Sequence, residues 1–145
     1  MRGFTLLELL IALAIFGVLA ALPVAHDRSD AVQLDAAVRA LSADLESARE
    51  EALRGGEPAG LAFLADGVSY ALYADVGGAA EVAPLWTRRL FAGRLARLAL
   101  RRAGWVVFAA DGSAISGGVL ELGLGSERRV VRVHEASGVV WVTKP

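Results

Sequence analysis

The sequence predicts an α+β protein in which a long N-terminal helix packs on an antiparallel C-terminal β-sheet domain. The chain opens with an apolar run from Phe4 to Ala25, and apolar residues then recur every three or four positions up to Ala52. From Ala59 onward the period changes to two, and glycine-containing turns separate the apolar runs. Periods of about 3.6 and 2 are typical of helices and strands respectively.

Length and composition fit one domain with a short accessory segment. The 145 residues have a mean hydropathy of +0.49, which is high for a soluble domain, and the N-terminal run supplies much of the excess. The net charge of −1 points to no charged class of partner. Cysteine is absent, which excludes disulfides and thiolate metal sites.

The N-terminal run is long enough to cross a membrane as a helix. Its 22 residues would span roughly 33 Å, against a hydrocarbon core of about 30 Å. A cleaved secretory signal has a shorter apolar stretch, and Leu19-Ala20-Ala21 is only a fair cleavage site. Arg2 precedes the run, and no excess of positive charge follows it. This favours an N-terminus on the cytoplasmic side of the membrane and export of the rest of the chain. We therefore predict a membrane segment at 4–25.

Three residues interrupt this run. Glu8 carries a charge that costs about 2.5–3.5 kcal/mol at the centre of a spanning helix and less near its end. Its carboxylate either reaches the lipid headgroups or pairs with a cation inside the membrane. Gly17 and Pro23 follow, and because proline removes one helical hydrogen bond we expect a bend between them, near residues 19–22.

The stretch Gly3-Phe4-Thr5-Leu6-Leu7-Glu8, followed by an apolar span, resembles the processing site of type IV pilins and type II secretion pseudopilins. The resemblance implies a leader at residues 1–3, cleavage after Gly3 by the prepilin peptidase, N-methylation of Phe4, and a role for Glu8 in subunit assembly. The leader is shorter than the family usually shows. The positive Phe4 amine would neutralise Glu8 of a neighbouring subunit, which offsets much of the cost of burying either charge.

Residues 26–55 are predicted to continue the helix as an amphipathic segment, giving one rod of about 50 residues. The apolar positions on its inner face are Ala31, Leu34, Val38, Leu41, Leu45, Ala48 and Ala52. Asp30 is expected as an N-cap or first-turn acid, and Arg54 to Gly56 as the end of the helix. A coiled coil is the alternative, but the strand-like sequence that follows favours packing on a sheet.

Residues 56–145 are predicted to form a periplasmic antiparallel β domain. Six strands are expected in the segments AGLAFL, VSYALY, WVVFAA, GVLELGL, RRVVRVHE and GVVWVTK, with Asp66-Gly67 and Asp111-Gly112 as turns. In the last two strands Val131, Val133, Val140 and Val142 alternate with Arg132, His134, Trp141 and Thr143. Residues 88–102 fit neither period.

Two further segments, LESAREEALRGGEPAGLAF and VFAADGSAISGGVLEL, resemble the minor pseudopilins that contain the H-type secretion subunit and related minor type IV pilins. The resemblance implies a single-pass inner-membrane subunit of the periplasmic pseudopilus, which drives protein export. Its partners would be other major and minor pseudopilins or pilins, the prepilin peptidase/methyltransferase and the inner-membrane assembly platform. A minor type IV pilin for pilus assembly, motility or DNA uptake is the alternative, and a signal-anchored periplasmic binding module is the third.

The remaining candidate residues favour structural roles. Six arginines between residues 88 and 102 are interpreted as a solvated face, and nucleic-acid binding is disfavoured. Trp86, Trp105 and Trp141 are expected to pack on the sheet rather than form an adhesive surface. His26 and His134 are far apart without a nucleophile, and Asp66, Asp75 and Asp111 belong to turns. We therefore expect no catalytic residue, metal site or cofactor, and no enzyme.

Overall fold

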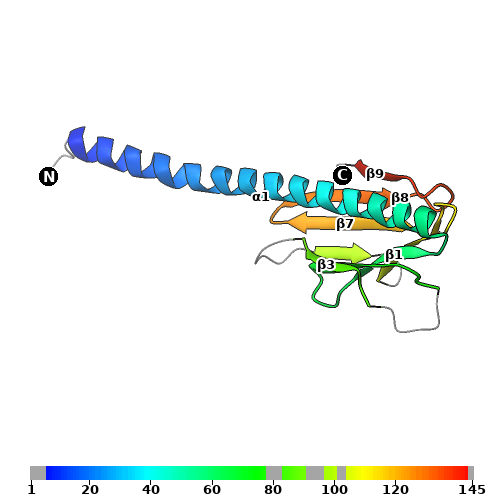
Figure 1. The fold of residues 1–145 in the computed structure, drawn as a ribbon. Coiled ribbons are helices and arrows are strands. Elements are labelled where there is room, and N and C mark those ends of the chain that lie inside the picture. The colour runs from blue at the N-terminus through cyan, green and yellow to red at the C-terminus, as the bar shows by residue number, and fades with distance from the viewer. Residues whose placement is uncertain (1–5, 78–82, 91–96, 101–103, 144–145) are drawn as a thin grey trace.

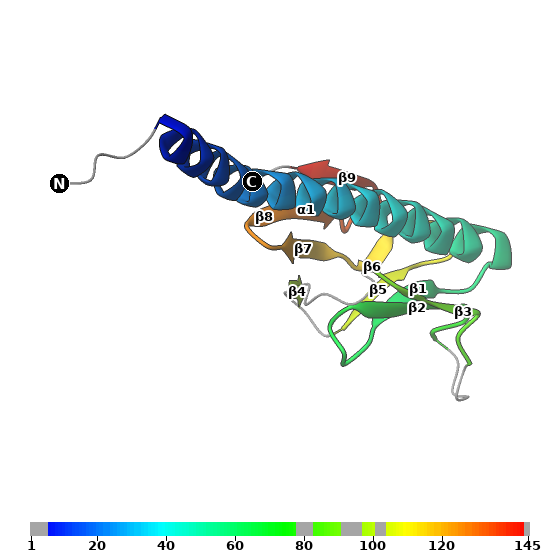
Figure 2. The same ribbon diagram turned by 90° about the vertical axis from the view of Figure 1, so that its left-hand side faces the viewer.

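The computed structural model describes residues 6–77, 83–90, 97–100 and 104–143, with the side chains of 19–29 and 97–100 outside that description. Figure 1 shows a long helix, α1, whose second half lies across a β domain. The first half projects beyond the strands, as the turned view of Figure 2 also shows. This arrangement confirms the predicted fold class.

Helix α1 (Leu6–Gly55) is uninterrupted over 50 residues. It ends where the sequence predicts, because Arg54 lies in its last turn and Gly56 adopts a left-handed φ of 70°. The Gly56 N–H donates a hydrogen bond to the Ala52 carbonyl at 3.0 Å, which closes the final turn.

The β domain contains two antiparallel sheets rather than the one expected. The five-stranded sheet has the order β3-β2-β1-β5-β6, and the four-stranded sheet has the order β4-β7-β8-β9. All six predicted strands are present, and β3, β4 and β6 are additional. The bounds are β1 Ala59–Phe63, β2 Ser69–Tyr73, β3 Trp86–Arg89, β4 Arg97–Leu100, β5 Trp105–Phe108, β6 Ala114–Ser116, β7 Gly118–Leu124, β8 Glu127–Val133 and β9 Val140–Thr143.

The segment 88–102, which fits neither period in the sequence, contributes to both sheets. Its start completes β3, which pairs with β2, and Arg97–Leu100 forms β4, which pairs with β7. Each strand is only four residues long, so neither shows enough alternation to be recognised from the sequence.

The two sheets meet at Gly117, which lies between β6 and β7, and at Gly118, the first residue of β7. A Cβ on Gly117 would lie 2.8 Å from the Val133 carbonyl oxygen, and Gly118 has a φ of 149°. The Ala114 N–H donates to the Glu135 carbonyl at 3.1 Å, which links β6 to the end of β8. The chain can change sheets here because these positions have no side chain.

The core lies between α1 and both sheets. Leu34, Leu41 and Leu45 of α1 are fully buried, as the helical spacing predicts, while Ala31 is half-buried. On β8 the predicted alternation is confirmed: its apolar residues Val131 and Val133 are buried, and Arg132 is exposed, as is His134 just beyond the strand.

Asp30 is not a helix cap, so that prediction is wrong. It lies inside α1, because the apolar and amphipathic segments join without a break and no helix begins there. Only 3% of its surface is exposed. Its carboxylate faces the β7–β8 turn, where a Cβ on Gly125 would lie 2.6 Å from Asp30 Oδ2.

The alternation in the last strand does not separate a buried face from an exposed one. In β9 Val140 is half-buried, but Val142 is 45% exposed and Trp141 is 40% exposed. Because β9 ends the four-stranded sheet, it has a neighbouring strand on one side only. Trp86 and Trp105 are half-buried and pack on the sheet as predicted, whereas Trp141 is more exposed and its ring contacts only the His134 ring among the described aromatic side chains.

Candidate assembly site

The first part of α1 exposes apolar side chains on every side. Over residues 6–18, which we call the N-terminal segment, every residue is exposed, including Leu6 at 82%, Phe16 at 73% and Val18 at 65%. A helix that is apolar all round is normally buried in protein or lipid. The rest of the chain does not cover the N-terminal segment, so its apolar surface is suited to contact with lipid or with other protein chains.

Glu8 is the only charged residue of the N-terminal segment. It lies in the first turn of α1 and is exposed. The partial positive charge at a helix N-terminus stabilises a carboxylate in this position. The structure therefore presents one acid on an otherwise apolar, accessible helix surface.

The other predicted site residues lie around this segment. Gly3 and Phe4 fall outside the described residues. Gly17 is exposed, and a Cβ added there would have no atom within 4 Å. The helix runs through both Gly17 and Pro23, and the bend between them stays a prediction.

Among the described residues, no helical stretch combines the length and hydropathy that crossing a membrane requires.

A buried carboxylate attaches the second half of α1 to the five-stranded sheet. Asp44, 6% exposed, accepts a hydrogen bond from the Tyr70 hydroxyl at 2.6 Å. Arg88 Nη1 donates to both Asp44 carboxylate oxygens, at 2.9 and 2.7 Å. The Arg88 guanidinium lies 5.2 Å from the centre of the Trp86 ring, which itself packs edge-on against Tyr70. Burial, and then the hydrogen bond to Asp44, raise the pKa of the Tyr70 hydroxyl.

A second ion pair attaches α1 to the four-stranded sheet. Arg129, 6% exposed, donates from Nε to Asp35 Oδ1 at 2.8 Å and from Nη1 to Glu127 Oε2 at 2.8 Å. The hydrogen bond to Glu127, followed by that to Asp35, raises the pKa of Arg129. Each sheet is thus tied to the helix by a charged group, in addition to the apolar core.

Neither attachment was predicted from the sequence, although the sequence contains a signal for one of them. Asp44 falls among Leu41, Leu45 and Ala48 on the buried face of the helix, and a carboxylate there requires a partner. Arg88 belongs to the arginine cluster that was interpreted as a solvated face. Arg88 and Arg89 are exposed as expected, but Arg88 reaches back to Asp44.

The turn aspartates have the structural roles that the sequence predicts. Asp66 accepts hydrogen bonds from the Val68 N–H, the Ser69 N–H and the Ser69 hydroxyl. Asp111 accepts from the N–H and hydroxyl of Ser113. The serine hydroxyl in each turn is the main cause that lowers the pKa of the aspartate. Within the described part of the chain no three His, Asp or Glu side chains gather as a metal site.

Comparison with known families decides what these features belong to. Residues 1–22 match the prokaryotic N-terminal methylation motif, and residues 37–137 match the type II transport protein GspH. The second match covers well over half of the chain. The chain belongs to the GspH family. It is a minor pseudopilin of a type II secretion system, as the sequence predicted. No individually curated protein matches the chain.

Solved structures of a pilin show the same fold. The type IV minor pilin FimU of Pseudomonas aeruginosa strain PAO1 matches in two crystal forms. In one, the TM-score is 0.65 at 19% identity, covering 79% of this chain and 91% of FimU. In the other, the TM-score is 0.60 at 21% identity, covering 76% and 92%. The GspH-family chain therefore has the pilin fold, with the N-terminal segment as its projecting helix.

Membership of this family has general consequences for partners. Proteins with the N-terminal methylation motif are substrates of a prepilin peptidase and assemble with other pilin-like subunits. Such subunits are structural rather than enzymatic.

Proposed function

We propose that this GspH-family subunit is held in the inner membrane by residues 4–25 and is then assembled into the periplasmic pseudopilus through Phe4 and Glu8. The observation that supports this most is the exposed, all-round apolar N-terminal segment with Glu8 as its one charge. The same surface suits lipid before assembly and neighbouring helices after it.

The length of the projecting helix supports a single membrane pass. From Leu6 to Asp30, the first residue of α1 seen to be buried, the helix rises about 36 Å. The hydrocarbon core of a bilayer is about 30 Å thick. The β domain would then begin just outside the membrane, on the periplasmic side.

Processing would give the N-terminal segment its second charge. Hydrolysis of the Gly3–Phe4 peptide bond leaves an amine on Phe4, which stays positive after N-methylation. In a bundle of apolar helices, this amine and Glu8 of an adjacent subunit lose far less solvation energy together than apart. Pairing them would fix the axial register of the subunits, as a buried polar residue does in coiled coils. The inner-membrane assembly platform would extract the subunit while this pair forms.

Replacing Glu8 tests the mechanism. Glu8→Leu is expected to leave membrane insertion unchanged, because it makes the helix more apolar, and to lower the subunit's recovery in sheared pseudopili at least tenfold. Glu50→Leu is the matched control, since Glu50 is an exposed acid in the second half of α1. Normal incorporation of Glu8→Leu would overturn the mechanism.

The mass of the mature protein tests processing separately. Protein extracted from membranes should begin at Phe4 and carry one additional methyl group. A chain that retains Met1, or that begins beyond residue 20, would instead favour a signal-anchored periplasmic module or a cleaved secretory signal.

Use of the same subunit in a type IV pilus is the alternative, and it is compatible with the fold shared with FimU. The two functions share processing and Glu8 pairing but differ in the filament that receives the subunit. Antibody labelling of purified type IV pili and of secretion pseudopili from the same cells would distinguish them.

A further inference from the structure

The edge strands of the two sheets differ in how they are protected. Three of the four edges have described side chains: β3, β6 and β9. Edge strands avoid pairing with other chains when they are short or carry charges. Strand β3 carries Arg88 and Arg89, and β6 has only three residues. Strand β9 has four residues, and from Gly138 to Thr143 the chain has neither a charge nor a proline.

The exposed side chains of this edge are large and apolar. Val139 is 46% exposed, Trp141 40% and Val142 45%. An uncharged edge with three such side chains would promote aggregation if it stayed uncovered. Lys144 and Pro145 follow Thr143 directly in the sequence, so the unprotected part of this edge is β9 itself, and its four residues are suited to pairing with another chain.

The backbone of β9 is oriented to accept a further strand. The His134 N–H donates to the Val139 carbonyl at 3.0 Å, and Trp141 is the register partner of Arg132. Because hydrogen-bonded and non-hydrogen-bonded pairs alternate in an antiparallel ladder, the N–H and C=O groups of Val140 and Val142 point away from β8. Among the described residues no strand pairs with that side of β9.

A cleft lies beside this edge, on the face of the four-stranded sheet that is turned away from the core. It has a volume of about 440 Å³, and its lining residues are Gly118, Val119, Arg132, Val133, His134, Glu135, Ala136 and Trp141. A side chain at residue 118 would point into open space, since a Cβ there meets no atom within 4 Å. The Trp141 ring packs 5.9 Å from the His134 ring and forms an apolar wall.

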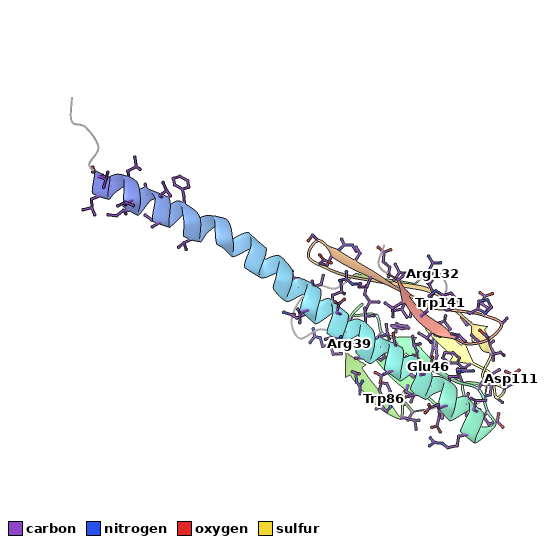
Figure 3. All side chains as sticks on the ribbon, turned by 90° about the horizontal axis from the view of Figure 1, so that it is seen from above. Arg39, Glu46, Trp86, Asp111, Arg132 and Trp141 are labelled. Carbon is purple, nitrogen blue, oxygen red and sulfur yellow. The ribbon has the colours of Figure 1, made fainter. Side chains whose placement is uncertain are left out.

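The cleft contains one cation, Arg132, and one carboxylate, Glu135. Arg132 is the register partner of Val119 on one side and of Trp141 on the other. Figure 3 shows Arg132 and Trp141 near each other over the sheet, apart from Arg39 and Glu46 of α1. Within the described part of the chain no acidic side chain forms an ion pair with Arg132. Beside the Trp141 wall, Arg132 is therefore the group of the cleft that a carboxylate of another chain could pair with.

We infer that β9 accepts an extended strand from a different subunit of the same filament. Main-chain hydrogen bonds form with Val140 and Val142, an apolar side chain of the added strand packs on Trp141, and a carboxylate of that strand faces Arg132. The inference rests on the proposed function only in taking the partner to be a filament subunit.

Geometry argues against a second copy of this chain as the partner. Two copies that both used this edge would pair antiparallel about a two-fold axis. The strands of the four-stranded sheet run along α1 (Figure 1), so the two helices would then point in opposite directions. Their N-terminal segments could not enter the same membrane. A secreted protein, present only in passing, would leave the apolar edge uncovered for most of the time.

Cross-linking from the edge tests the inference in the full chain. Because the protein has no cysteine, Val142→Cys can be labelled uniquely with a benzophenone maleimide in membranes that contain all the filament subunits. Ile115→Cys is the matched control, since Ile115 is 63% exposed on β6, the edge of the other sheet. Irradiation and peptide mass spectrometry should find another filament subunit joined at Val142→Cys, at least fivefold more than at Ile115→Cys. Equal yields, a cross-link only to a second copy or to a secreted protein, or no cross-link, would overturn the inference.

Charge substitutions give an independent readout. Val142→Lys and Arg132→Glu should each lower co-purification of the cross-linked partner at least fivefold, whereas Ile115→Lys should not. All three positions are exposed, so thermal unfolding should change little. If the chain is processed to Phe4 and enters filaments but these variants change nothing, the edge inference fails alone. If the chain is never processed or assembled, the proposed function fails.

Discussion

The two halves of α1 share one uninterrupted backbone but meet different surroundings. In the N-terminal segment the side chains of Leu6, Leu13 and Phe16 are more than half exposed, whereas Leu41 and Leu45 in the second half are fully buried. The apolar residues of the first half surround the helix, and those of the second half form one stripe. A stripe can be covered by the chain's own sheets, but an all-round apolar surface requires other molecules. The second half of the helix thus packs in the core of the domain, while the first half provides an apolar surface for contacts with other molecules.

The acids of the two halves differ in the same way. Asp44 is buried and has Tyr70 and Arg88 as partners from its own chain. Glu8 is exposed on an apolar surface, and in the proposed mechanism its cationic partner arrives on another subunit. One carboxylate stabilises the fold of its own chain, and the other is proposed to stabilise a filament.

Truncating matched leucines should give the largest contrast between the halves. Leu41→Ala is expected to lower the free energy of unfolding of the β domain by about 2–5 kcal/mol, because Leu41 is fully buried and the change leaves a cavity. Leu13→Ala removes a side chain that is 66% exposed and should leave that free energy unchanged. Denaturant unfolding of the full chain in micelles, followed by tryptophan fluorescence, measures both. A large loss of stability in Leu13→Ala would mean that the N-terminal segment packs on the domain after all.

The two acids provide the next contrast. Asp44→Ala should cost about 2–3 kcal/mol of folding stability, since it leaves the Tyr70 hydroxyl buried without its acceptor. Glu8→Ala should leave unfolding unchanged and remove the subunit from pseudopili. When unfolding and filament recovery are measured on both variants, Asp44→Ala should therefore lose folding stability, and Glu8→Ala should lose only filament recovery. If Asp44→Ala unfolded like the parent protein, the attachment to the five-stranded sheet would carry no stability.

Features of this molecule that depend on neighbouring residues could be predicted from the sequence, whereas features that depend on contacts between distant residues could not. The end of α1 and the Asp66-Gly67 turn depend on neighbouring residues, and both were predicted correctly. The division into two sheets depends on Gly117 passing close to the Val133 carbonyl, a contact between distant residues that no local pattern encodes. At Asp30 the local sequence was misleading. Aspartate is a typical helix cap, but α1 runs through this position without a break, so no helix begins there.

The candidate site divides in the same manner. The apolar run and Glu8 could be found from the sequence because their meaning lies in composition and spacing. The partner of Asp44 could not, since Arg88 is 44 positions away and belongs to a cluster that looks solvated. The exposure of both faces of β9 could not be predicted, because alternation does not show that a strand lies at the edge of its sheet.

A smaller effect concerns the two tyrosines of β2, Tyr70 and Tyr73, which should contribute differently to the pH dependence of folding stability. The raised pKa of Tyr70 means that the folded protein keeps this hydroxyl protonated where the unfolded chain, at its ordinary value of 10.0, loses the proton. The stabilising contribution is therefore complete below pH 10 and declines as the pH rises above it. Tyr70→Phe should cost about 1.5 kcal/mol at pH 8 and lack this alkaline decline. Tyr73→Phe, on the same strand, is the control and should retain it. Parallel pH curves for the parent and Tyr70→Phe would contradict the assignment.

The smallest expected effect concerns the backbone of the first half. Gly17→Ala introduces a methyl group into open space and should stabilise the local helix by about 0.5–1 kcal/mol. Amide exchange over residues 14–22 in micelles should slow roughly two- to fivefold, because exchange there requires local opening of the helix. Gly55→Ala, equally uncrowded but at the other end of α1, should leave this exchange unchanged. If subunits must bend between Gly17 and Pro23 to pack in a filament, Gly17→Ala will assemble less well even though its helix is more stable. Slower exchange with normal assembly would show that the N-terminal segment packs as a straight rod, and that its exposed surface, rather than its flexibility, distinguishes it from the second half.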